Sequence, residues 1–239
     1  MRRVRIIGGG RAGTSLAIAL QRRDWKVLPL LGREDDLSTA AKGVDLVVIA
    51  TPDTVISEVA GSIAPRSDVV VAHMSGALDL QTLLPHKRRA SFHPLASLPS
   101  AERGAERLLE GAWFAIEGDP IAKEVVDVLG GKSLRVHAKD RAVYHATAVM
   151  ASNHIVALLG QVERMSNSLG IPFEAFLNLA EKSLDNVRLV GPALALTGPS
   201  ARGDQVTVEK HLSGLPPEER PGYEVMADLA WRLAQESRR

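Results

Sequence analysis

Three glycines near the start of the chain have the spacing of a phosphate-binding loop. Gly8, Gly10 and Gly13 form the pattern G-x-G-x-x-G between an expected strand, 3–7, and an expected helix, 14–22. In such a loop the first glycine permits a tight turn, the second lets the backbone approach a diphosphate, and the third lets the helix pack closely on the strand. The spacing therefore predicts a dinucleotide site, although a glycine-rich turn without a ligand would share it.

The helix after the loop adds an anion-binding end to this site. The backbone N–H groups at its N-terminus have no acceptor within the helix, and the positive end of the helix dipole lies there. Arg11 and Ala12 stand in the loop just before this helix. We therefore expect Arg11 and Ala12 to contact the cofactor. A Walker A loop is excluded, because Thr14 stands where its phosphate-binding lysine is required.

The end of the second expected strand decides which dinucleotide fits. An Asp or Glu at this position binds the ribose 2′-hydroxyl of NAD(H), whereas an Arg accommodates the 2′-phosphate of NADP(H). Arg33 stands 20 residues after Gly13, which favours NADP(H). Glu34 follows directly, and a shift of one residue would favour NAD(H) instead.

Polar residues also follow the later strands of the expected sheet. Thr51 and Pro52, and then Ser75, are expected to contact the cofactor, because ligands of open α/β sheets bind at the carboxyl ends of the strands. His93 follows another strand and is a candidate substrate contact. Each has a structural alternative: Thr51 as a helix cap, Ser75 as part of a turn, and His93 as a turn histidine.

A helical stretch in the second half carries the candidate proton donor. Histidine as a residue type exchanges a proton near neutral pH, which suits a general acid, so His145 is the first candidate, with Tyr144 and Lys139 held in reserve. At 100° per residue Ser152 lies within about 20° of His145, with Asn153 at the margin of that face. Ser152 and Asn153 would then orient a substrate, unless these polar side chains merely satisfy one another.

Arg202 is a second substrate candidate, because a guanidinium can bind a carboxylate through two parallel hydrogen bonds. Its structural alternative is an ion pair with Asp204 across a turn.

The elements that must position these residues fall into two halves. In the first half, short Val- and Ile-rich runs alternate with helical stretches, as in a doubly wound parallel sheet. The expected strands are 3–7, 26–31, 45–50, 68–72, 90–92, 113–117 and 134–137. We expect a Rossmann domain over 1–138, followed by an all-helical substrate and dimerisation domain over 139–239.

The second half lacks strand signals. Residues 141–169 contain no Pro and one internal Gly, and predict one helix of about 29 residues and about 43 Å. Further helices are expected at 172–189, 202–212 and 217–235. So long a helix is hard to cover with the remaining residues, which predicts a homodimer formed through the helical domain.

Composition excludes several classes of protein. The 239 residues carry a net charge of +1 and 4% aromatic residues, which argues against a nucleic-acid partner. The chain has no cysteine, and its histidines form no metal-binding motif, so no metal is expected and a cytoplasmic location is favoured. The apolar run 44–50 is too short to span a bilayer, so no membrane partner is expected. The G-x-S-x-G motif of hydrolases is absent.

The glycine loop and six further stretches together carry a family resemblance. These stretches are 49–53 (IATPD), 73–77 (HMSGA), 92–95 (FHPL), 144–146 (YHA), 151–154 (ASNH) and 197–204 (TGPSARGD). With them the chain resembles short Rossmann-like dehydrogenases whose helical C-terminal half is a domain of unknown function. That family is similar to ketopantoate reductase, pyrroline-5-carboxylate reductase and the 6-phosphogluconate dehydrogenase group. The resemblance implies an NAD(P)-dependent oxidoreductase fold whose C-terminal domain is like that of 6-phosphogluconate dehydrogenase and often dimerises.

The residues and the resemblance together predict an NADP(H)-dependent oxidoreductase. Its substrate would be a small carbonyl or imine compound held between the two domains. A sensor that binds the cofactor without turnover is the alternative, and a methyltransferase that binds adenosylmethionine at the glycine loop is a remote third.

Overall fold

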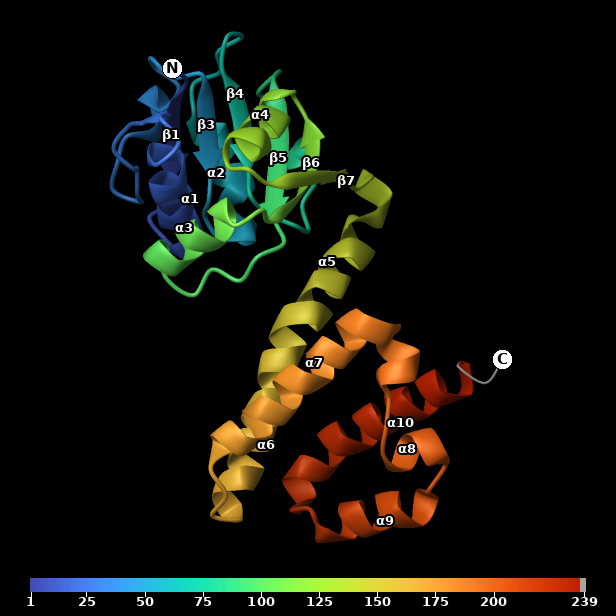
Figure 1. Cartoon of the computed structure of the whole chain (residues 1–239). Coiled ribbons are helices and arrows are strands. Elements are labelled where there is room, and N and C mark those ends of the chain that lie inside the picture. Colours follow the sequence, from blue (N-terminus) through green and yellow to red (C-terminus); the bar gives the residue numbers. More distant parts are fainter. Residues whose placement is uncertain (237–239) are drawn as a thin grey trace. The chain divides into compact units, whose positions relative to one another are not determined.

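A computed structural model of the chain describes residues 1–236, which form two compact units that divide between Met150 and Ala151. The first unit is built on a seven-stranded sheet with the order β2-β1-β3-β4-β5-β6-β7 (Figure 1). The strands are β1 (Arg3–Ile7), β2 (Lys26–Val27), β3 (Leu46–Ile49), β4 (Val70–His73), β5 (Arg89–Pro94), β6 (Trp113–Gly118) and β7 (Lys132–Arg135). Neighbouring strands are parallel except β5 and β6. The predicted Rossmann-like sheet is confirmed.

Strand β2 forms one edge of the sheet and has two residues, whereas the sequence predicts six. Pro29 has no N–H and cannot donate to a strand ladder, so the regular pairing with β1 stops at Val27. The chain rejoins the sheet at Leu31, which forms a single bridge with Ile7. Gly32 and Arg33 therefore still follow a strand end beside the glycine loop.

Helices cover both faces of the sheet. Helices α1, α3 and α4 cover one face and α2 covers the other (Figure 1). The helices of this unit are α1 (Arg11–Gln21), α2 (Ile56–Ser62), α3 (Ala101–Leu109), α4 (Ile121–Val128) and α5 (Arg141–Val149), with short 3₁₀ turns η1 (Leu37–Thr39), η2 (Asp53–Val55), η3 (Leu80–Leu83) and η4 (Ala138–Asp140).

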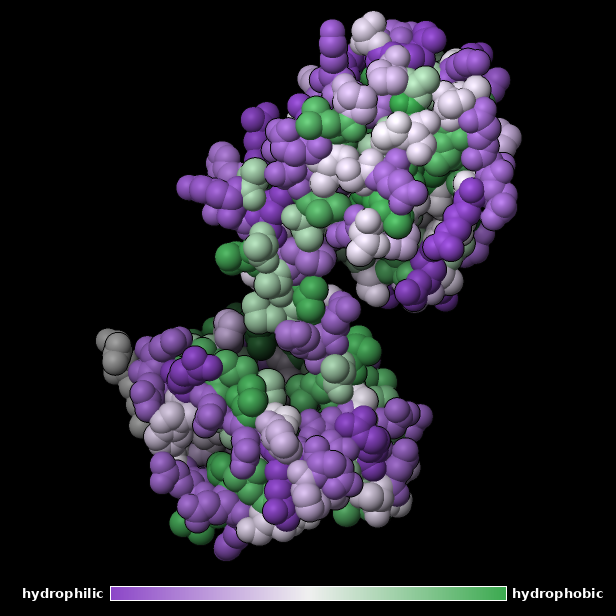
Figure 2. Space-filling model, turned by 180° about the vertical axis from the view of Figure 1, so that it is seen from behind, coloured by the Kyte–Doolittle hydropathy of each residue, from purple (hydrophilic) through white to green (hydrophobic). Residues whose placement is uncertain are grey.

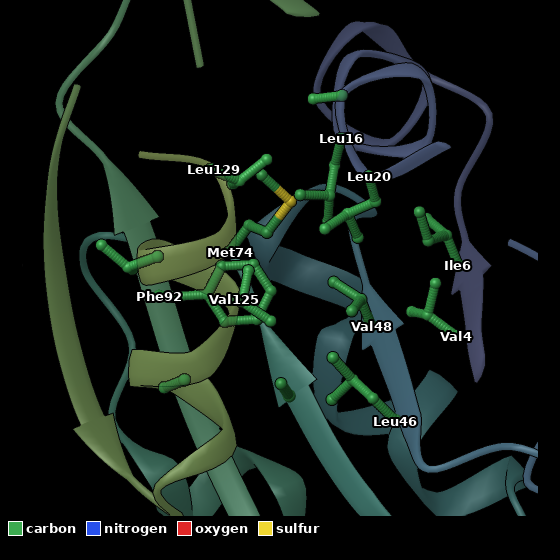
Figure 3. Packing of buried hydrophobic residues seen from close by; sticks show 14 of the residues in the cluster. Val4, Ile6, Leu16, Leu20, Leu46, Val48, Met74, Phe92, Val125 and Leu129 are labelled. Carbon is green, nitrogen blue, oxygen red and sulfur yellow. The ribbon is translucent and has the colours of Figure 1, made fainter. Parts of the chain in front are cut away.

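The core of the first unit consists of two apolar clusters, one on each face. The larger cluster includes Phe92 of β5 and Leu16 and Leu20 of α1, with Met74 between them (Figure 3). Ile49 of β3 and Ile56 of α2 belong to the other cluster. All four residues of β3 are buried, as expected for a strand that is covered on both faces.

The second unit is helical in all its described elements. They are α6 (Ile155–Ser168), α7 (Phe173–Ala195), α8 (Pro199–Arg202), α9 (Gln205–Gly214) and α10 (Arg220–Glu236), with the 3₁₀ turn η6 (Pro217–Glu219). Helix α7 is kinked where Gly191 has non-helical backbone angles and Pro192 follows it. The predicted division after residue 138 falls before α5, whereas the compact units divide after α5.

The helical unit has almost no apolar core of its own. Among its described residues, Ala234 is the only buried apolar one. Large apolar side chains are instead exposed, among them Leu179, Leu189 and Leu194 of α7, which are 64%, 79% and 75% exposed. Figure 2 shows hydrophobic side chains on the surface of this unit. Other exposed large apolar residues of this unit are Val156, Leu169, Val190, Val206 and Val225.

A helix of 31 residues, Ala138–Ser168, joins the two units and contains a π-helical segment, Met150–His154 (η5). The predicted single helix over 141–169 is thus continuous but irregular. By length and composition alone it is apolar enough to cross a membrane, and none of its most apolar 18-residue window is buried. A search for uninterrupted apolar runs misses this helix, because polar residues are spread among its apolar ones.

Candidate functional site

The glycine loop has the geometry that its spacing predicts. Gly8 has a φ of +112°, and a Cβ there would lie 2.7 Å from the carbonyl oxygen of Ala50. A Cβ on Gly13 would overlap the carbonyl oxygen of Gly8, so α1 packs against the loop only because Gly13 has no side chain. Around the Cβ position of Gly10 there is no atom within 4 Å. The first and third glycines are thus required by contacts, and the second borders open space.

The N-terminus of α1 meets that open space. Gly10 caps the helix without a side-chain hydrogen bond, and the first turn contains no acidic residue. The N–H groups of the first turn therefore remain available to an anion, as at dinucleotide sites. A pocket of about 790 Å³ lies here and is lined by Gly8, Gly9, Gly10, Arg33, Thr51 and Pro52, among others.

The charges that line this pocket come mainly from the loop after β2. Among the described lining residues, Arg33 is the only cation, and Glu34 is not part of the lining. Asp35 and Asp36 do line it, but Asp35 accepts the N–H of Gly32 at 2.7 Å and Asp36 accepts the N–H of Ser38 at 2.9 Å. The hydrogen bonds from Ser38 lower the pKa of Asp36.

Four predicted cofactor residues lie outside the lining of the pocket. One is Gly13, which is buried against the carbonyl group of Gly8. Arg11 is exposed at the start of α1, and Ala12 packs against the larger apolar cluster. Ser75 is buried: its hydroxyl donates to Asp53 Oδ2 at 2.6 Å and accepts the N–H groups of Ala77 and Leu78. These contacts fix the loop after β4 and occupy the Ser75 hydroxyl.

The loop after β4 supports a second cluster of polar side chains, His93, Tyr144 and His145. His93 Nδ1 lies 2.7 Å from the hydroxyl of Tyr144, and the rings of His93 and His145 are 5.8 Å apart. A Cβ on Gly76 would lie 2.7 Å from His145 Nδ1 and 2.9 Å from His93 Nε2. The two imidazoles therefore approach the backbone at Gly76 closely, and no other residue type would fit there without displacing them.

The environment of this cluster keeps His93 neutral at neutral pH. Burial, with a smaller contribution from the neighbouring His145, lowers the pKa of His93 to about 4. Burial likewise lowers the pKa of His73, at the end of β4, to about 4 and raises the pKa of Tyr144 to about 12. The Nδ1 atom of His145 is buried and has no hydrogen-bond partner in the part of the chain that the structure describes. His145 thus presents an unsatisfied nitrogen beside a neutral imidazole and a neutral phenol.

Ser152 and Asn153 lie in the second unit, within η5, where the Ser152 hydroxyl donates to Asn153 Oδ1 at 2.9 Å. The π-helical segment changes the number of residues per turn, so the 100° spacing assumed between His145 and Ser152 does not apply across it, and the shared face stays a prediction. Lys139 is exposed in η4. Among the described residues, no group of His, Asp and Glu could hold a metal ion.

Arg202 is exposed at the end of α8. Asp204, its alternative ion-pair partner, caps α9 by accepting hydrogen bonds from the N–H and hydroxyl groups of Thr207. The carboxylate is thus engaged in a helix cap.

Residues 112–230 match the model of a family described as a domain of unknown function, DUF2520. No curated protein matches the chain.

Solved structures match over nearly the whole chain. A provisionally assigned NADP oxidoreductase from Bacteroides fragilis, BF3122, is 19% identical, covers 97% of this chain and 98% of its own, and has a TM-score of 0.83. Protein TM1727 from Thermotoga maritima is 25% identical, with 99% and 100% coverage and a TM-score of 0.76. Pyrroline-5-carboxylate reductase from Streptococcus pyogenes is 15% identical, with 97% and 98% coverage and a TM-score of 0.66. The resemblance inferred from the sequence is confirmed, as is the fold.

Proposed function

We propose that this chain, which carries a DUF2520 domain over residues 112–230, is an NADP(H)-dependent oxidoreductase acting on a small carbonyl or imine compound. The observation that carries the proposal is the glycine loop, where Gly10 and the uncapped start of α1 border a pocket large enough for a dinucleotide. The similarity to BF3122 and to pyrroline-5-carboxylate reductase supports the same class of reaction.

The residues of the first unit fit the phosphate groups of NADP(H). The N–H groups at the start of α1 would hold the diphosphate, and Arg33 would pair with the 2′-phosphate, because it is the only cation among the described residues that line the pocket. Thr51 and Pro52 would contact the ribose or nicotinamide portion from the end of β3. When bound, the nicotinamide supplies or accepts the hydride.

The cluster around His93 would handle the proton. Reduction of a C=O or C=N bond adds a hydride to carbon and a proton to oxygen or nitrogen, so a donor must lie beside the heteroatom. We assign this role first to His145, with Tyr144 in reserve, and a substrate contact to His93. Ser152, Asn153 and Arg202 remain candidates for orienting the substrate.

A titration with NADPH and NADH tests the cofactor site. We expect tighter binding of NADPH and at least about a tenfold loss in Gly10→Ala, because an added methyl group would occupy the approach of the diphosphate. Gly61→Ala is the matched control, since its Cβ position is equally open and Gly61 does not line the pocket. Absence of binding of either coenzyme to the wild-type protein would overturn the proposal.

A turnover assay separates the enzyme from the sensor. Oxidation of NADPH is followed with small ketones, 2-oxo acids and cyclic imines, alone and with amines. We expect turnover that His145→Ala abolishes while NADPH binding is kept. NADPH binding without turnover across this panel would favour the sensor.

We further propose that two copies associate through their helical units. The support is the exposed apolar side chains of α7 and the single buried apolar residue in the described part of that unit. In this arrangement the exposed apolar side chains of α6 face a second copy rather than lipid. Sedimentation without detergent should give a dimer, and binding of the protein to lipid vesicles would contradict both this assignment and the expected cytoplasmic location.

A further inference from the structure

Arg141 has no role in the proposed chemistry, yet it is the first residue of α5 and only 2% exposed. Arginine is rarely buried so completely unless it is paired. Its Nη2 atom donates to Glu117 Oε2 at 2.6 Å and to Ser91 Oγ at 2.7 Å, and its Nε atom donates to the same Glu117 oxygen at 3.1 Å. The guanidinium is therefore held at a fixed position and orientation.

The two acceptors of this guanidinium lie opposite each other in the sheet. Ser91 of β5 pairs with Glu117 of β6 in the antiparallel register. Because side chains alternate along a strand, His93 projects from the same face of β5 as Ser91. Arg141 thus binds β5 and β6 at once. Its contact on β5, Ser91, lies two residues before His93 of the polar cluster.

The residues of α5 have a spacing that matches that of Ser91 and His93 on β5. Tyr144 and His145 follow Arg141 by three and four residues, which places them on the same side of α5. Three to four residues of helix rise about 4.5–6 Å, and two residues of strand rise about 6.6 Å. The spacing along α5 is therefore close to the spacing along β5. Arg141 can bind Ser91 and Glu117 while Tyr144 contacts His93.

We infer that Arg141 is a positioning residue: by anchoring the start of α5 to β5 and β6, it brings Tyr144 and His145 onto His93 and Gly76. This inference rests on the proposed function, which assigns proton transfer to that cluster. The anchoring of α5 by Arg141 does not depend on a cofactor. A second effect follows from charge, because Arg141 also disfavours protonation of His93 and lowers its pKa. The other charged or titratable groups around His93 are Tyr144 and His145 of α5, Asp53 after β3 and His73 of β4.

The test combines Arg141→Met with the double variant Arg141→Met/Glu117→Leu. The double variant removes both charges together, and so keeps the protein folded even if the single variant, with its uncompensated Glu117, does not fold. The control is Arg88→Met, which breaks another arginine–carboxylate pair of the same unit, Arg88 with Asp119 at 2.9 Å. The readouts are the NMR contact between the rings of His93 and Tyr144, the titration of His93, and the affinity for NADPH.

In the folded double variant we expect the ring contact to be lost and the pKa of His93 to rise from about 4 toward its ordinary value of 6.5. Arg88→Met should leave both unchanged. NADPH affinity should be kept in every variant, because none of the substituted residues lines the pocket at the glycine loop. A double variant that retains the ring contact and the low pKa would overturn the positioning role, whereas a wild-type protein that fails to bind NADPH would overturn the proposed function and leave the anchoring testable by NMR.

Discussion

Acid should destabilise the first unit through His93, and substitution of this histidine should remove part of the effect. Burial lowers the pKa of His93 from 6.5 to about 4. Below pH 6.5 the unfolded chain therefore binds a proton that the folded chain does not accept until the pH approaches 4, so the free energy of unfolding falls as the pH falls through this window. At about pH 5 the loss relative to neutral pH is about 2 kcal/mol for this one histidine. His73, with its pKa also lowered to about 4, should add a loss of similar size.

Denaturant unfolding at fixed protein concentration, followed by the fluorescence of the buried Trp25, measures this effect in the first unit. His93→Gln should reduce the loss of unfolding free energy between about pH 7 and pH 5 by about 2 kcal/mol. His137→Gln is the matched control, because His137 is exposed in the same unit. The comparison concerns the pH dependence rather than the stability at one pH, so a general cost of the substitution cancels. If His93→Gln loses as much stability in acid as the wild-type protein, the burial of a neutral His93 is refuted.

Three further substitutions have defined outcomes. Arg33→Ala should weaken NADPH binding by about 10- to 100-fold and leave NADH binding unchanged, because it removes a charged hydrogen bond to the 2′-phosphate; equal losses for both coenzymes in a titration would contradict this. Gly76→Val should displace the imidazoles beside it and lower turnover by about 100-fold or more at unchanged NADPH affinity, while Gly61→Val, in open space, should not. Leu189→Asp should convert the dimer to a monomer in sedimentation, whereas Leu84→Asp, which alters an exposed leucine of the first unit, should leave the dimer intact.

The sheet and the cofactor loop were predictable because their signals are local. Consecutive apolar residues such as those of β3 predict a strand that is buried on both faces, and glycine spacing predicts a turn and a close contact. The short β2 follows from Pro29, a signal that the sequence also contains, but the continuing apolar pattern up to Leu31 suggested a longer strand. Of the residues predicted to bind the cofactor, the pocket includes Gly8, Gly10, Arg33, Thr51 and Pro52 in its lining.

The polar cluster was only half predictable because it depends on how α5 docks on the sheet. His93, Tyr144 and His145 each stood out by residue type, but their meeting at Gly76 requires the contact of Arg141 with β5 and β6, between residues far apart in the sequence. The π-helical segment was not predictable, because no residue in Met150–His154 distinguishes it from an ordinary α-helix. That segment removed the basis for grouping Ser152 with His145.

The two edges of the sheet carry a consequence for how copies of the protein meet. One edge is β2, whose two residues leave few unpaired backbone groups before Pro29, and the other is β7, which begins and ends with the exposed cations Lys132 and Arg135. Short strands, proline and like charges all oppose the joining of one sheet to another across molecules. We therefore expect little cross-molecular β-structure when the protein is concentrated, which agrees with the proposed association of copies through their helices.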